Sequence, residues 1–203
     1  MGRYEIVQQL HKKGFYKMWP IKKMGPIIFH IYPGLKIKDI WFKKRSSIYQ
    51  KNAKILGIKK IPKVNFYIYP DQESGEKLGF QLGFSFSFIG EIHSRVNQTP
   101  GHELTHILIK SLNHPKNLPA GGLWSEGLAT YLNGDNKKLY KKYVKQLISN
   151  EEILNRPWDN WKQHIPDSLY PLTASIIQYL VQKYKWSKTL SFIKQIKNLG
   201  DNQ

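Results

Sequence analysis

The apolar positions in the first half of the chain follow two periods, which predicts a mixture of helices and strands. Apolar residues recur at helical spacing in residues 2–13 and 39–56. Strand patterns occupy four further segments, at residues 27–32, 64–69, 79–88 and 91–96. The third of these alternates strictly and places five apolar residues on one face, which we expect in the core. Residues 14–26 carry two glycines and two prolines, so we expect a connector there.

The second half of the chain is predicted to be helical. Thr99 is a good N-cap and Pro100 suits the first helical position, so we expect a helix from here to about Asn113. Further helices are predicted at residues 123–132, from Asp135 onward, at 171–184 and at 187–199. Residues 149–169 show no regular pattern.

The change of pattern near residue 98 predicts the fold class α+β. We expect a small, mostly antiparallel sheet with a helix in residues 27–98, then a helical lobe in residues 99–199, with a cleft between them. The two lobes would form a single domain, residues 27–199, preceded by an N-terminal extension, residues 1–26. A length of 203 residues with 40% hydrophobic side chains suits one domain with a sizeable core.

A short motif on the first helix of the predicted helical lobe has metal-binding chemistry. The sequence His102-Glu103-Leu104-Thr105-His106 is an H-E-x-x-H motif. On a helix its two histidines lie one turn apart on the same face, so both imidazoles can reach one zinc ion. Glu103 is rotated by about 100° from His102, so it can act on a water molecule at the zinc without being a ligand. The motif predicts zinc in the cleft, with Glu103 as the general base.

Catalytic zinc takes three protein ligands and leaves a position for water, so a third ligand is needed. The chain has no cysteine, which restricts this ligand to a histidine or a carboxylate. Glu126 follows His106 by 20 residues, and the segment between them is rich in proline and glycine. Two helices joined by such a turn can pack antiparallel, which would bring Glu126 to the ion. We therefore expect one zinc ion per chain, bound by His102, His106 and Glu126.

These motifs resemble those of a known enzyme family. The H-E-x-x-H motif followed by Trp124–Tyr131, W-S-E-G-L-A-T-Y, resembles the gluzincin zinc metallopeptidases of the thermolysin-like "peptidase MA" type. The similarity extends more weakly over residues 27–199. The resemblance implies zinc-dependent hydrolysis of peptide bonds in a peptide or protein substrate, with Glu126 as the third zinc ligand.

The resemblance also implies an edge strand and an oxyanion donor beside the metal. Residues 91–96 would be the edge strand above the cleft, to which an extended peptide could add as a further strand. A tyrosine or histidine would stabilise the negative charge on the reacting carbonyl oxygen; Tyr170 is the candidate, with Tyr131 and His93 as alternatives. The family has an acidic residue one turn after the ligand glutamate, where this chain has Thr130. Support for a zinc histidine must then come from another residue, or the metal is held less firmly.

The net charge leaves a second hypothesis open. The chain has 32 lysines and arginines against 14 acidic residues, which gives a net charge of +18. This charge favours acidic partners, among them acidic peptide substrates, although scattered lysines are more simply explained as a solvated surface. The alternative function is a basic protein that binds nucleic acid or an anionic surface and carries a vestigial metal site. No nucleic-acid-binding motif supports it.

No segment has the length and apolar character of a signal peptide or of a membrane span. A soluble, cytoplasmic protein is therefore the default expectation. The mature form of an exported protein is the alternative.

Overall fold

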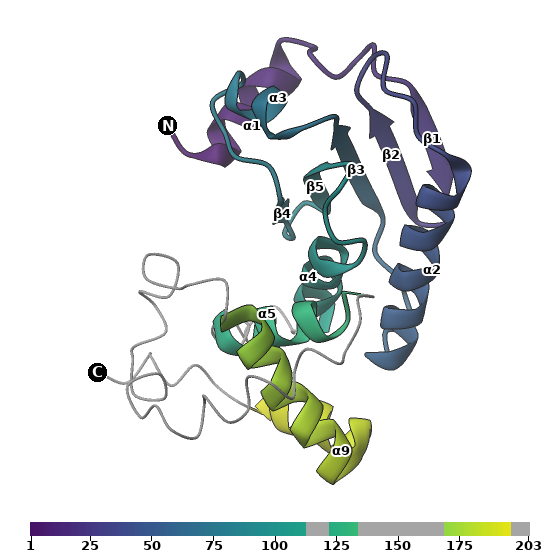
Figure 1. Ribbon diagram of the computed structural model, residues 1–203, viewed down its shortest axis with the longest axis vertical. Coiled ribbons are helices and arrows are strands. Elements are labelled where there is room, and N and C mark those ends of the chain that lie inside the picture. The colour runs from purple at the N-terminus through teal and green to yellow at the C-terminus, as the bar shows by residue number, and fades with distance from the viewer. Residues whose placement is uncertain (113–121, 134–168, 196–203) are drawn as a thin grey trace.

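A five-stranded mixed sheet forms the N-terminal lobe (Figure 1). The computed structural model describes residues 1–112, 122–133 and 169–195. The strands are β1 (Ile21–Met24), β2 (Ile27–Ile31), β3 (Val64–Tyr69), β4 (Phe84–Phe86) and β5 (Glu91–Arg95). They are arranged in the order β1-β2-β3-β5-β4, with parallel pairs at the centre and antiparallel pairs at both edges. Because helices follow this sheet, the predicted α+β class is confirmed.

Apart from α3 (Gln72–Glu76), which was not predicted, the helices within the described residues agree with the helical spacing of apolar residues. They are α1 (Arg3–Lys12), α2 (Asp39–Ile55), α3 (Gln72–Glu76), α4 (His102–Leu112), α5 (Gly122–Tyr131) and α9 (Leu169–Gln195). α9 consists of two helices that meet at Lys185, where φ is 64° and ψ is 164°, so both predicted C-terminal helices are present. The helix predicted from Asp135 and nearly all of the irregular segment 149–169 lie outside the described residues. No helix in the described ranges is long and apolar enough to cross a membrane.

The connector predicted at residues 14–26 was wrong, because it contains β1. Gly25 has φ 59° and, with Pro26, forms a two-residue turn that joins Met24 to Ile27 in the β1–β2 hairpin. A glycine with positive φ at the first turn position suits the twist of a tight hairpin. The N-terminal extension therefore contributes a strand to the sheet lobe.

The strand predicted over residues 79–88 is interrupted. Phe84–Phe86 alone pairs with β5, because Gly79 and Gly83 have φ values of 89° and 95° that an extended strand does not adopt. Three of the five apolar residues are buried as expected, but Phe88 is 60% exposed. Its place in the predicted core was therefore wrong.

The expectation that residues 91–96 form an edge strand was also wrong. β5 pairs with β3 on one side and with β4 on the other. The edge strand on this side of the sheet is β4.

The two faces of the sheet carry two different cores. In β3, Phe66 and Ile68 face a core shared with α2, α4, α5 and α9, whereas Tyr67 and Tyr69 face a second core shared with α1. This alternation is the period of two of a strand with both faces covered. The first core positions the helices that carry the metal-binding motif.

The N-terminus of α4 lies later than its predicted capping residues. The helix begins at His102, and the Gly101 carbonyl accepts the hydrogen bond of the Thr105 N–H at 2.9 Å. Gly101 therefore occupies the N-cap position that was predicted for Thr99. A Cβ at residue 101 would lie 2.7 Å from the Asn133 carbonyl oxygen, so the close approach of these segments requires glycine here.

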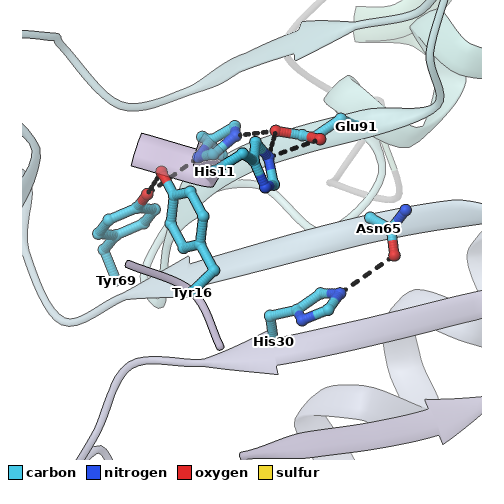
Figure 2. Close-up of polar contacts among 7 residues, drawn as sticks. His11, Tyr16, His30, Asn65, Tyr69 and Glu91 are labelled. Atoms are coloured by element: carbon cyan, nitrogen blue, oxygen red, sulfur yellow. Dashed lines mark hydrogen bonds and ion pairs between the residues drawn. The ribbon is translucent and has the colours of Figure 1, made fainter. Parts of the chain in front are cut away.

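A buried polar network holds α1 to the second core (Figure 2). The Glu91 carboxylate is 3.0 Å from Nε2 of His11 on α1 and 2.7 Å from Nε2 of His93 on β5. Nδ1 of His93 lies 2.9 Å from the Tyr69 hydroxyl, which lies 3.1 Å from the Tyr16 hydroxyl. One assignment satisfies every contact: Tyr16 donates to Tyr69, Tyr69 donates to His93, and both imidazoles donate to Glu91.

The Glu91 carboxylate is ionised in this network. Burial raises its pKa, but the hydrogen bonds from His93 and His11 outweigh burial, so the pKa lies below the ordinary value. Burial also lowers the pKa of His93, which keeps that imidazole neutral.

We predict that Glu91→Gln lowers the free energy of unfolding by about 2 kcal/mol at neutral pH, because it weakens hydrogen bonds to a buried charge. A lowered pKa stabilises the fold above the ordinary value of 4.5 and ceases to do so as pH falls through the folded pKa. The difference between wild type and variant should therefore narrow below about pH 4. Urea denaturation at several pH values measures this difference in the free energy of unfolding. Glu73→Gln, which removes an exposed ion pair with Lys77, is the control, and equal losses in both variants would contradict the prediction.

Candidate metal centre

Two helices that pack together carry the three predicted ligands. α4 directs Leu104, Ile107 and Leu108 into the core and leaves His102 and His106 partly exposed on its other side. The two imidazoles are one turn apart, with ring centroids at 4.8 Å. α5 packs against α4 and supplies Glu126 (Figure 1). The structure thus brings together the three residues that the motif and the W-S-E-G segment predicted as ligands.

The three potential ligand atoms form a nearly equilateral triangle. Nε2 of His102 is 3.1 Å from Oε2 of Glu126 and 3.2 Å from Nε2 of His106. Nε2 of His106 is 3.3 Å from the same Oε2 atom. Ligand atoms at 2.0–2.1 Å from a tetrahedral zinc ion are about 3.3 to 3.4 Å apart. The observed separations therefore fit coordination of one ion.

Hydrogen bonding alone cannot satisfy this triangle. If both Nε2 atoms donate to Glu126, then two N–H groups face one another across 3.2 Å. If one Nε2 atom instead accepts a hydrogen bond from the other, it carries no proton, so its contact with Oε2 of Glu126 is not a hydrogen bond. A cation would take lone pairs from all three atoms at once, so the donor set fits a metal.

The protonation state of Glu126 is the one that a metal ligand needs. Burial raises the pKa of this carboxyl, but the imidazoles of His102 and His106 more than reverse the effect and hold it well below the ordinary value. The carboxylate is therefore ionised, and ionised carboxylates are the form that binds zinc.

Ser125 supports one of the histidines, a role that the sequence did not reveal. Its hydroxyl oxygen lies 3.0 Å from Nδ1 of His106. When it accepts the Nδ1 proton, the lone pair of Nε2 points toward Glu126 and the proposed metal. Thr130, at the position of the family's acidic residue, is buried. The sequence does show a hydroxyl side chain, Ser125, directly before Glu126. Whether that hydroxyl points toward His106 depends on how α5 packs against α4.

Glu103 follows His102 on α4 and is not one of the three grouped residues. It is partly exposed, and its carboxylate makes no hydrogen bond or ion pair with any other described residue. Its place next to His102 rotates it by about 100° around α4. Within the described residues, no other side chain therefore holds this carboxylate in place.

Of the three candidates for oxyanion donor, Tyr170 is the one beside a predicted ligand, His102. Its ring lies 5.8 Å from the His102 ring, and it is 42% exposed. Tyr131 is buried against Trp186 and lies about 140° around α5 from Glu126, five residues along the helix. His93 is 0% exposed in the core that faces α1, on the other side of the sheet from α4, so its candidacy was wrong.

A glycine directly after Glu126 lets α9 approach α5 closely. A Cβ at Gly127 would lie 3.0 Å from the Thr173 carbonyl oxygen and 3.2 Å from the Ile177 side chain. The close contact between α5 and α9 places Tyr170, in the first turn of α9, against His102. Gly127 thus allows close packing between α5, which carries Glu126, and α9, which carries Tyr170.

We predict that Ser125→Ala lowers zinc affinity by about 10- to 100-fold, because His106 loses the partner that fixes its tautomer. Competition with a chelating indicator measures the affinity. Ser111→Ala is a matched control, since that hydroxyl on α4 bonds to the Leu108 carbonyl and does not touch an imidazole. Equal zinc affinities in wild type and Ser125→Ala would show that the Ser125 hydroxyl does not support His106 as a ligand.

No model of a protein family matches the chain, and neither does any curated protein or solved structure.

Proposed function

We propose that the protein is a zinc metallopeptidase. The observation that carries the proposal is the triangle formed by His102, His106 and Glu126, with ligand-atom separations of 3.1 to 3.3 Å. The uncommitted carboxylate of Glu103 beside it supports a hydrolytic role rather than a structural one, since a structural zinc site is closed by four ligands. Three protein ligands leave room for water and substrate.

Zinc, when bound, would supply a Lewis acid that lowers the pKa of water and polarises the scissile carbonyl. Glu103 then acts as the general base and takes a proton from the attacking water. The water oxygen bonds to the carbonyl carbon, the C–N bond breaks, and Glu103 passes its proton to the leaving amine. His102, His106 and Glu126 stay unchanged throughout.

Tyr170 is proposed to donate a hydrogen bond to the carbonyl oxygen as negative charge develops on it. Its contact with His102 supports this role, because the phenol ring is then one side chain away from the metal ligands. A donor placed there stabilises the transition state more than the bound substrate.

The substrate is proposed to bind as an extended peptide along the open side of β4. β4 is the edge strand of the sheet and packs against α4, the helix of the H-E-x-x-H motif. Backbone groups on the open side of an edge strand can pair with an added chain. This assigns to β4 the role that the resemblance implied for residues 91–96.

We predict that Glu103→Gln keeps its zinc and its fold but loses about 10³-fold or more of its peptidase turnover, since the amide cannot accept the proton. A mixture of fluorogenic peptides measures turnover, and elemental analysis measures zinc. Glu76→Gln, at an exposed acid outside the site, is the control and should keep full activity. Near-wild-type turnover in Glu103→Gln would require another base.

A second variant tests the oxyanion donor. Tyr170→Phe removes the phenol hydroxyl and keeps the ring, so we expect kcat to fall by about 10²-fold with KM and zinc content little changed. Tyr179→Phe, at an exposed tyrosine on the same helix, should leave kcat unchanged. An unchanged kcat in Tyr170→Phe would leave this residue with a packing role only.

A further inference from the structure

The outer side of α2 is strongly basic. Its inner side packs Phe42, Tyr49 and Ala53 into the core, while the outer side carries the exposed lysines Lys43, Lys44, Lys51 and Lys54. At about 100° per residue, these four lysines fall within about 100° of arc. We call them the α2 lysine face.

Further lysines extend this basic surface beyond both ends of the helix. Lys36 and Lys38 precede α2, and Lys59 and Lys60 follow it; all four are exposed. No hydrogen bond or ion pair joins any of the eight lysines to another described residue. The one acidic residue between positions 36 and 60 is Asp39, whose carboxylate is paired with Lys22. Within the described residues, no acidic side chain is therefore paired with this surface.

The other residues on the same arc point to one class of partner. Ile40 lies at the centre of the arc and is 68% exposed, and Ser47 lies beside it. The arginine of this helix, Arg45, is turned inward and donates to the Gln98 carbonyl. The face thus presents ammonium groups around an aliphatic side chain, with no guanidinium fork and no aromatic ring for stacking on bases.

We propose that the α2 lysine face docks on an anionic lipid bilayer. Lysines near such a surface are attracted to its acidic headgroups, and each adds to the binding. The helix spans about 25 Å, which lets several lysines contact a flat surface at once. Ile40 then enters the boundary between headgroups and acyl chains, as apolar side chains of interfacial helices do.

Docking through this face leaves the metal centre open. The inner side of α2 contacts α4, where the Asn52 amide donates to the Thr105 hydroxyl. The lysine face therefore points away from α4, and α2 lies along the outside of the sheet (Figure 1). A substrate could reach Glu103 while the protein is bound to the membrane.

Co-sedimentation of the full chain with lipid vesicles tests the proposal. We expect binding to vesicles of phosphatidylcholine with phosphatidylserine, weak binding to phosphatidylcholine alone, and a decline of binding with added salt. Replacing the four lysines of the face by glutamine should weaken binding roughly 1,000-fold, at about 1 kcal/mol for each lysine. A control variant that replaces four exposed lysines elsewhere (Lys12, Lys17, Lys23 and Lys188) by glutamine removes the same charge and should lose far less.

The Ile40→Gln variant distinguishes binding to a bilayer from binding to other polyanions. It should weaken binding to vesicles several-fold, since one aliphatic side chain is lost from the interface, and leave binding to duplex DNA unchanged. Three results would overturn the proposal: no binding to the anionic vesicles, equal losses in the two quadruple variants, or binding to DNA without binding to vesicles. Circular dichroism and thermal unfolding establish that each variant is folded. Because no residue of the metal centre is changed, these outcomes are independent of peptidase activity.

Discussion

The proposed metal centre depends on how closely α5 approaches both α4 and α9. His102 and His106 are related by one turn of a single helix, so their spacing is local, but Glu126 reaches them only if α5 lies directly against α4. Side-chain packing and backbone contacts fix this approach: the Asn52 amide of α2 donates both to Thr105 on α4 and to the Leu132 carbonyl after α5. Gly101 and Gly127 permit contacts with Asn133 and Thr173 that a Cβ would prevent. A shift of α5 by one ångström would open a triangle whose sides are 3.1 to 3.3 Å.

Glu91 and Glu126 each lie between two imidazoles, but their environments give the two carboxylates different roles. Glu91 is buried among aromatic rings, and each contact around it has a proton to share, so the network is complete without a further partner. Glu126 is partly exposed, and the two imidazoles beside it also face one another. The arrangement around Glu91 stabilises the docking of α1, whereas the arrangement around Glu126 fits a cation. The residue types are the same in both groups. The groups differ in solvent exposure and in whether the two imidazoles face one another.

The parts of the fold that follow from local periodicity could be predicted from the sequence. The helices α1 and α2 repeat one hydrophobic period, and the central strands β2 and β3 are short apolar runs. The three predicted ligands follow from helical spacing within the H-E-x-x-H motif and from the W-S-E-G segment. β1 was missed because Gly25 and Pro26 indicate a turn without revealing that a strand precedes it. The support of His106 by Ser125, and the burial of His93, depend on how elements pack across long separations in sequence. Spacing along the chain does not encode such contacts.

Native mass spectrometry of the purified chain after equilibration with zinc counts the zinc ions that each chain binds. If His102, His106 and Glu126 form a catalytic metal site, the wild-type protein binds one zinc ion per chain and Glu126→Ala binds none under the same conditions, while both remain folded. Glu126→Ala is the sharpest variant because this ligand comes from α5, outside the H-E-x-x-H motif, and so reports on the packing of the two helices. A wild-type chain without zinc, or a Glu126→Ala chain with a full equivalent, would contradict the account.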